Sequence, residues 1–178
     1  MAEKRETINL TGTVRTAAGR RIVAFDEHSS RQLPSRGQVA VDVMDETGIF
    51  TVVIEPDGRK GHWVAIDGRG PLAVDAADGQ TLELQVATGA DWPEVLVPAD
   101  LAQALEEAPE LHDTWRSLTP MARWEWVRWV GATKNPATRS RRVEVSISEL
   151  RGGKRRPCCF DLSSCTDPDV AKGGKLMS

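Results

Sequence analysis

The first ninety residues contain short stretches in which apolar and polar positions alternate, as in Val39, Val41 and Val43. Such alternation is typical of β-strands with one dry and one wet face. Gly, Pro, Asp and Ser residues, which favour turns, separate the stretches. Six strands are predicted in this way, at residues 8–14, 21–25, 38–44, 49–55, 62–66 and 81–87. Short strands at this spacing indicate a compact barrel or sandwich.

Beyond Trp92-Pro93 the apolar residues recur at helical spacing. Helices are predicted within residues 97–108 and 109–118, followed by a Trp-rich helix and a last helix that ends at Gly152-Gly153. Thr119-Pro120 and Asn135-Pro136 each supply an N-cap and a first helical residue for the last two. Residues 143–147 alternate like a strand, but the caps on both sides favour a helix.

We therefore predict an α+β fold, with an N-terminal small β-barrel followed by a C-terminal helical subdomain of three to four helices. The predicted boundaries are a barrel domain at 1–92, a helical domain at 93–156 and a polar, Cys-containing tail at 157–178. The tail follows a Gly-rich and basic stretch, and we find no internal repeat.

The Trp-rich helix has one broad apolar arc that carries Trp126 and Trp129, which we interpret as core residues. Trp124 points the other way, and Arg128 lies one turn further on, so a cation–π contact between the two is expected. Either the tail or the barrel covers Trp124, which is the interpretation we favour, or its ring is available to stack on a ligand.

Arg139 lies close to the apolar face of the last helix, so its guanidinium should be partly buried and needs a partner. We favour a carboxylate of the acidic barrel; the alternative is an anionic group of a ligand. Arg142 lies at the border of the same face, and Thr138 is in the first turn, where backbone amides are free to bind an anion. Arg141 lies nearly opposite and should be solvated.

Charge is distributed unevenly along the 178 residues, although the net charge is only −3. Residues 1–119 carry 11 Lys/Arg and 20 Asp/Glu, whereas residues 120–156 carry 10 and 3. The basic segment either docks on the acidic part of the chain or attracts an anion. Nucleic acid is a weaker alternative, because a dedicated nucleic-acid-binding domain usually has a stronger basic balance than a chain with a pI near 5.7.

The sequence gives no grounds for naming a reaction. Cys158, Cys159 and Cys165 have neither the spacing nor the nearby His of a zinc site, and packed thiols are favoured over a redox-sensitive or catalytic thiol. No phosphate-binding loop, dinucleotide fingerprint or nucleophile elbow is present. No metal and no cofactor are predicted, and an enzyme is less favoured than a binding protein. Without an apolar run of signal-peptide or membrane-helix length, we expect a cytoplasmic protein with no membrane partner.

Several of these residues resemble the YdeI/OmpD-associated family, also called bacteriocin-protection proteins. The resemblance covers roughly residues 95–160. Its features are Val97-Pro98, Asp100-Leu101, Ala104-Leu105, the aromatic-rich helix, Lys134, Thr138-Arg139, Arg141-Arg142 and the ending RRPCCF at 155–160. The first ninety residues resemble the small β-barrel domain of unknown function that often precedes it, notably at IEPDGRKGHWV. They depart from it at Asp78-Gly79, where Gly-Asp is commoner.

The resemblance implies a bacterial cytoplasmic protein with a link to bacteriocin or stress protection, and it supplies no catalytic residue. Our leading hypothesis is a non-enzymatic module that binds a small anionic or aromatic ligand between barrel and helices. A nucleic-acid-associated protein and a thiol-dependent enzyme are the alternatives, and the oligomeric state stays open. The predicted ligand-binding residues are Trp124, Arg128, Lys134, Thr138, Arg139 and Arg142.

Overall fold

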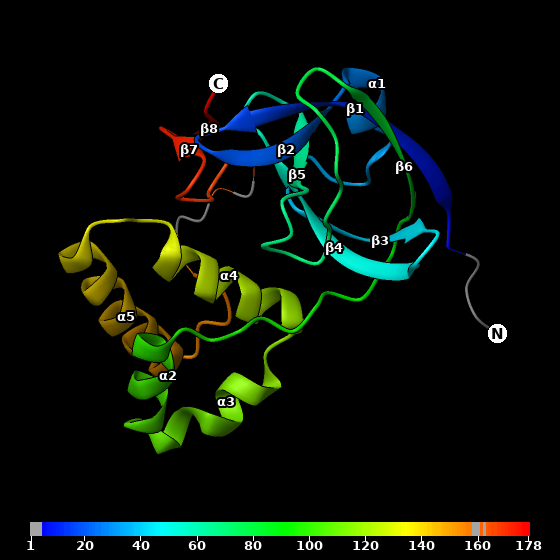
Figure 1. Ribbon diagram of the computed structural model, residues 1–178. Coiled ribbons are helices and arrows are strands. Elements are labelled where there is room, and N and C mark those ends of the chain that lie inside the picture. Colours follow the sequence, from blue (N-terminus) through cyan, green and yellow to red (C-terminus); the bar gives the residue numbers. More distant parts are fainter. Residues whose placement is uncertain (1–4, 158–160, 162) are drawn as a thin grey trace. The chain divides into compact units, whose positions relative to one another are not determined.

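The computed structural model describes residues 5–157, 161 and 163–178 (Figure 1). The chain forms two compact units. The first, which we call the barrel unit, runs up to Trp92 and includes two C-terminal stretches that end at Cys165 and at Ser178. The second, the helical unit, comprises Pro93–Asp161 and Thr166–Pro168. Across the described residues, every helix is too short or too polar to cross a membrane.

Six antiparallel strands form a closed barrel in the order β1-β2-β5-β4-β3-β6. The alternation seen in the sequence places Val, Ile and Leu side chains inside, where they form one buried core. A short helix, α1, follows β2 and carries the chain across one end of the barrel. The bounds are β1 Thr7–Ala17, β2 Arg20–Phe25, α1 Glu27–Gln32, β3 Val39–Asp45, β4 Gly48–Pro56, β5 His62–Ala65 and β6 Thr81–Ala87.

The barrel closes because the first strand, β1, pairs with the last barrel strand, β6, as well as with β2. Residues Thr7–Thr13 pair with β6, and Gly12–Ala17 pair with β2, so Gly12 belongs to both ladders. A Cβ atom on Gly12 would lie 2.5 Å from Cγ1 of Val23 and 2.7 Å from the carbonyl oxygen of Ala24. Only glycine allows the two strands to approach so closely at this point.

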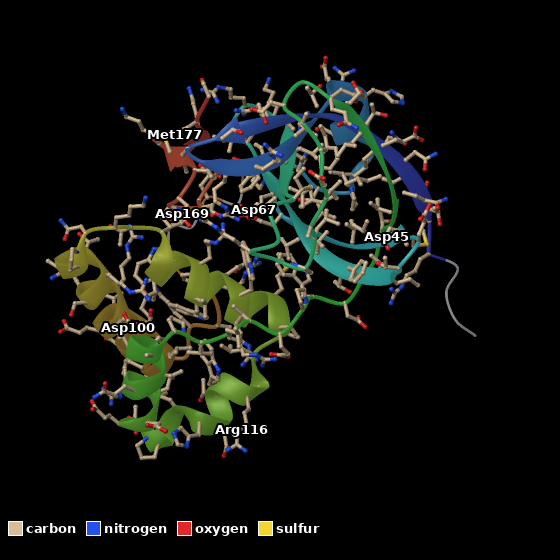
Figure 2. All side chains as sticks on the ribbon, viewed as in Figure 1. Asp45, Asp67, Asp100, Arg116, Asp169 and Met177 are labelled. Atoms are coloured by element: carbon tan, nitrogen blue, oxygen red, sulfur yellow. The ribbon has the colours of Figure 1, made fainter. Side chains whose placement is uncertain are left out.

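The C-terminal part of the chain adds a second, two-stranded sheet to the barrel unit. Strands β7 (Ala171–Lys172) and β8 (Lys175–Leu176) form a hairpin through Gly173-Gly174, both with positive φ. Buried side chains of this region pack on the barrel in a small cluster: Ala17, Ile22, Trp63, Cys165, Val170 and Leu176. The buried guanidinium of Arg20 pairs with Asp67 and, at 3.8 Å, with Asp169, both labelled in Figure 2.

The helical unit contains four α-helices and one 3-10 turn in its described residues. Thr119 and Asn135 cap the two long helices, because their side-chain oxygens accept the N–H groups of Ala122 and Thr138 at 3.1 Å. Pro120 and Pro136 occupy the first helical positions, as predicted. The bounds are α2 Ala99–Glu106, η1 Pro109–Leu111, α3 His112–Ser117, α4 Pro120–Gly131 and α5 Pro136–Arg151.

One apolar core holds these helices together, and Trp126 is at its centre. Its ring is fully buried and meets Trp129 edge to face, with 6.3 Å between the ring centroids. The indole N–H donates to the carbonyl oxygen of Arg155 at 3.1 Å, so burial leaves no polar group of this ring unpaired. The other buried members are Leu101, Leu105, Ala108, Leu111, Leu118, Ala122, Val130, Val143, Ile147 and Leu150.

The predicted fold class is confirmed: a closed six-stranded barrel precedes a set of helices. Each of the six predicted strands is present, and residues 143–147 lie in helix α5. Helix α1 was not predicted. Its six residues are too few to show a helical period, although Asp26 is a recognisable N-cap whose side chain accepts the N–H of Ser29 at 2.7 Å.

Replacing Gly12 by Ala should destabilise the protein by about 1–3 kcal/mol, because the added methyl group overlaps Val23 and the β2 backbone. Urea unfolding of the wild type and the variant would measure this. Gly70→Ala is a matched control, since a Cβ atom there meets nothing within 4 Å. Equal unfolding midpoints for the two variants would contradict the close approach at Gly12.

Candidate functional site

A cavity of about 630 Å³ lies at one end of the barrel. Its position follows from strand pairing. Strands β2 and β5 are antiparallel, with Ala24 opposite Trp63, so the end of β2 and the start of β5 lie at the same end. Strands β3 and β4 pair with Val39 opposite Ile54, which brings the segment before β3 to that end as well. Helix α1 and the β4–β5 loop, residues 57–61, therefore meet around the cavity.

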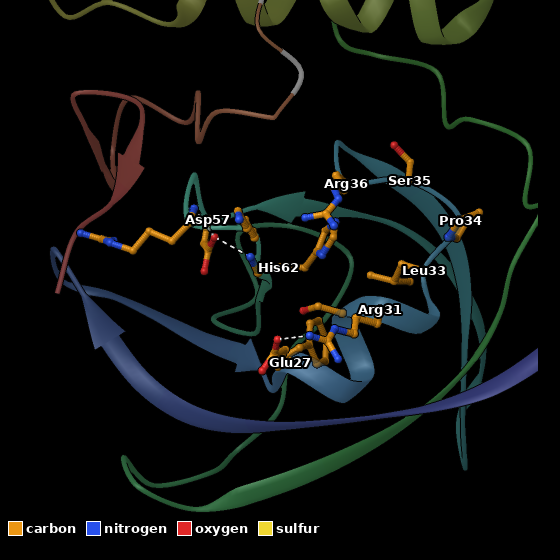
Figure 3. A pocket seen from close by; sticks show the side chains of 13 residues that line it. Glu27, Arg31, Leu33, Pro34, Ser35, Arg36, Asp57 and His62 are labelled. Carbon is orange, nitrogen blue, oxygen red and sulfur yellow. Dashed lines mark hydrogen bonds and ion pairs between the residues drawn. The ribbon is translucent and has the colours of Figure 1, made fainter.

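Four cationic and two anionic side chains line this cavity (Figure 3). Glu27 and Arg31 come from α1, and Asp57 comes from the β4–β5 loop. The remaining charged residues are Arg36, Arg59 and Lys60. Phe25 is the one aromatic residue in the lining, and it is buried. The cavity is thus polar and carries an excess of positive charge.

Both carboxylates of the lining are already engaged. Glu27 pairs with Arg31 one turn away on α1. One oxygen of Asp57 accepts the backbone N–H groups of Arg59, at 2.6 Å, and Gly61, at 2.9 Å, which fixes the loop. By contrast, within the described part of the chain no carboxylate lies within 4 Å of Arg36 or Lys60.

Lys60 has a backbone conformation that is uncommon for a residue with a side chain. Its φ of 73° is in the left-handed region, where Gly or Asn is the usual residue. The neighbouring Gly58 and Gly61 show that the loop has glycine at other positions. Lys60 is thus a lysine at a backbone position that costs free energy, in a loop that lines the cavity.

The wall of the cavity contains two buried polar atoms that the fold does not satisfy. His62 is 2% exposed, and its Nε2 donates to the carbonyl oxygen of Gly37 at 3.1 Å. Its Nδ1, and the hydroxyl oxygen of buried Ser30, have no hydrogen-bond partner among the described residues. Unpaired buried polar groups cost stability, and an ordered water or a bound polar molecule would satisfy them.

Burial lowers the pKa of His62, and the carbonyl of Gly37 and the charge of Asp57 oppose that effect only in part. The ring is therefore neutral near pH 7. Since a carbonyl oxygen can only accept, Nε2 carries the proton and Nδ1 has the lone pair.

In the helical unit, Arg139 is partly buried, as predicted, and has a carboxylate partner. Its Nε and Nη2 donate to the two oxygens of Asp100, at 2.7 Å and 3.1 Å. The pair lowers the pKa of Asp100 and raises that of Arg139, chiefly through these hydrogen bonds. The prediction that the acid would come from the barrel was wrong: Asp100 is in α2, which packs against α5. Figure 2 labels Asp100 on that helix.

Arg142 and Arg128 stack on tryptophan rings. Arg142 donates to the carbonyl oxygen of Trp129 at 2.8 Å and lies 5.3 Å from the centre of that ring. It thus binds an otherwise free carbonyl in the last turn of α4. Arg128 lies 4.7 Å from the centre of the Trp124 ring, which is the expected cation–π contact, and donates to the hydroxyl of Thr166 at 3.3 Å. Trp124 is buried.

The other predicted site residues are dispersed. Lys134 and Thr138 are exposed, and the N–H of Thr138 binds the Asn135 cap. Cys165 is buried beside Trp63 in the barrel unit, a packing position, whereas Cys158 and Cys159 lie outside the described residues. Of the predicted site residues, Trp124 therefore contacts Arg128, and Arg142 contacts helix α4 through Trp129. Two cavities of the helical unit, of about 320 and 210 Å³, are lined by other residues.

Glu125 is a structural residue that the sequence did not single out. Its side chain is 2% exposed, and the guanidinium of Arg156 binds both of its oxygens. This contact raises the pKa of Arg156. The sequence contained a signal for this pair, since a glutamate between Trp124 and Trp126, in a helix whose apolar arc is buried, is expected to need a cation. The pair fastens the chain after α5 to α4.

The barrel cavity was also missed. Neither Asp57 nor His62 was predicted as a site residue from the sequence, and the structure places both in the cavity wall. The adjacent cations Arg59 and Lys60 in the loop are the feature of the sequence that could have indicated this cavity. Within the ranges that the structure describes, no group of three His, Cys, Asp or Glu residues is arranged to hold a metal ion.

The Arg139–Asp100 pair should show energetic coupling. Because both groups are partly solvated, Arg139→Ala should cost about 1 kcal/mol, and a double-mutant cycle with Asp100→Ala should give a coupling of about 0.5–1 kcal/mol. Urea unfolding measures both. Arg141→Ala, on the exposed face of the same helix, is the control and should change stability by less than about 0.5 kcal/mol. Strictly additive effects of the two pair variants would disprove the coupling.

His62 should make stability depend on pH. In the unfolded chain its pKa is about 6.5, and in the folded chain it is lower, so the unfolded state binds more protons as the pH falls below that value. The contribution is complete above about pH 6.5 and is lost below it, with a slope no steeper than about 1.4 kcal/mol per pH unit. The difference in unfolding free energy between wild type and His62→Gln, measured from pH 5 to 8, should be constant above about pH 6.5 and should change as the pH falls below that value, with the wild type losing stability relative to the variant. Parallel curves would contradict this.

Comparison with known proteins identifies one part of the chain. Residues 94–153 match the family model described as Bacteriocin-protection, YdeI or OmpD-Associated. Searches of curated proteins and of solved structures returned no significant match. The matched segment contains helices α2 to α5 with the Arg139–Asp100 pair, and the barrel precedes it. The resemblance stated from the sequence is thereby confirmed for this segment: residues 94–153 are similar to the YdeI/OmpD-associated, bacteriocin-protection family.

Proposed function

We propose that the protein is a binding module that holds a small anionic molecule in the cavity at the end of the barrel. The observation that carries this proposal is the charge balance of the lining. Four cations face two carboxylates, and both carboxylates are engaged by Arg31 or by backbone N–H groups. An anion entering the cavity would supply the negative charge that Arg36 and Lys60 lack.

Arg36 and Lys60 have different roles in this proposal. Arg36 has a planar fork of donors that suits a carboxylate or phosphate, and Lys60 supplies a point charge from the opposite segment of the wall. The buried polar atoms of His62 and Ser30 lie beneath the surface of the same wall. A small shift of the wall, or an ordered water, would bring them into contact with a bound polar molecule.

The proposed function is the one inferred from the sequence, a binding module. The proposed site, however, lies at the end of the barrel and not among the helical residues. A module that binds an anion fits a protective role such as the family description names, and we include that role in the proposal. Ligand binding by the helical residues around Arg139, which the sequence analysis predicted as the site, stays a prediction. Its arginines bind Asp100 and Trp129, which supports a structural role for them.

Calorimetric titration at low ionic strength would test the proposal, with phosphate, citrate and anionic aromatic compounds as ligands. Arg36→Ala and Lys60→Gly should each weaken binding about tenfold, as expected for losing one charge-assisted contact. Lys60→Gly relieves the strained φ and should fold at least as stably as the wild type, so weaker binding cannot be due to misfolding.

Arg69→Ala is the matched control. Arg69 is an exposed cation of the same unit that does not line the cavity, and its loss should leave binding unchanged. Arg139→Ala in the same titration tests the helical cluster separately. If no anion binds the wild type, or if Lys60→Gly and Arg36→Ala bind as well as Arg69→Ala, the barrel cavity is not the site.

A further inference from the structure

The C-terminal hairpin places two positive charges directly opposite each other. Lys172 of β7 and Lys175 of β8 are partners in the antiparallel register, and both are exposed. Side chains of directly opposite residues lie on the same face of a ladder, and like charges in that position are destabilising. No carboxylate of the described residues pairs with either lysine. The hairpin keeps an arrangement that costs it stability.

These two lysines share a cavity of about 230 Å³ with Arg59. Leu176, Met177 and Ser178 complete its lining, so it contains three cationic side chains and no Asp or Glu side chain. Arg59 also lines the larger cavity at the end of the barrel. The two cavities therefore share Arg59 as a lining residue, and basic residues line both: Arg36 and Lys60 in the larger, Lys172 and Lys175 in the smaller.

Short backbone contacts hold the hairpin against the β4–β5 loop. The N–H of Leu176 donates to the carbonyl oxygen of Asp57 at 2.9 Å, and Arg59 donates to the carbonyl oxygen of Leu176 at 2.7 Å. Gly58 lies so close to the turn that a Cβ atom there would be 2.0 Å from the carbonyl oxygen of Gly174. The loop and the hairpin that carry these cations are thus in direct contact within the barrel unit.

We propose that the two cavities together bind a linear anion with several negative groups along its chain, of the class of inorganic polyphosphate. This inference rests on the proposed function and extends it. A single compact anion in the larger cavity would leave Lys172 and Lys175 unneutralised, whereas a chain that crosses Arg59 would neutralise both. Single-stranded nucleic acid fits less well, because it is usually held by exposed aromatic rings, and the one aromatic lining residue, Phe25, is buried.

Binding of orthophosphate, tripolyphosphate and long-chain polyphosphate to the full chain would test this inference. Wild-type affinity per molecule should rise about tenfold or more from tripolyphosphate to the long chain, with a steeper salt dependence. The double variant Lys172→Ser, Lys175→Ser should lose that gain and still bind orthophosphate like the wild type. Removing the like-charge pair should not lower the unfolding midpoint, which excludes misfolding as the cause.

Arg36→Ala provides the complementary variant, since it should weaken the binding of all three phosphates. If orthophosphate binds but chain length gives no gain, or if the double variant keeps the gain, the extended site is disproved and the small-anion site stands. If no phosphate and no other anion binds the wild type, both proposals fail. Tighter binding of single-stranded DNA than of polyphosphate with equal charge would overturn the assignment to polyphosphate.

Discussion

Barrel closure depends on the double pairing of one strand. Strand β1 lies between β2 and β6 and pairs with both. Without it, both neighbours would expose unpaired backbone groups. Gly12 makes the double pairing sterically feasible. The barrel end that carries the cavity depends on this closure in turn, because the positions of α1 and of the loop at residues 57–61 are set by β2 and by its partner β5.

The basic segment at residues 120–156 is largely neutralised inside the helical unit. Residues 93–156 carry 11 Lys/Arg and 9 Asp/Glu, a balance of +2. Arg123, Arg139 and Arg151 pair with Glu94, Asp100 and Glu110, which all precede α3. A cluster that looks like a positive face in the sequence is therefore a set of bridges between helices. In the barrel unit the balance is reversed, since residues 1–92 carry 10 Lys/Arg and 14 Asp/Glu, yet among the described residues no carboxylate lies within 4 Å of Arg36 or Lys60.

Local signals made the secondary structure predictable. Alternation gave the strands, and Thr119-Pro120 and Asn135-Pro136 gave the helix starts, because a cap depends on neighbours in sequence. Spatial pairing was not predictable in the same way. Arg139 needed a carboxylate, but which one depends on the packing of α2 on α5. The cavity joins Arg36 to Lys60 through the order of strands in the barrel, and no periodicity in the sequence encodes that order.

The course of the chain has a consequence for biosynthesis. Residues up to Trp92 belong to the barrel unit, the following residues form the helical unit, and the β7–β8 hairpin belongs to the barrel unit again. The six strands can assemble on the ribosome as soon as β6 has emerged, since domains generally form in the order of their synthesis. The loop at residues 57–61, however, acquires its contacts with Leu176 only after the helices have been translated. These contacts of the loop therefore form later than the pairing of the six barrel strands.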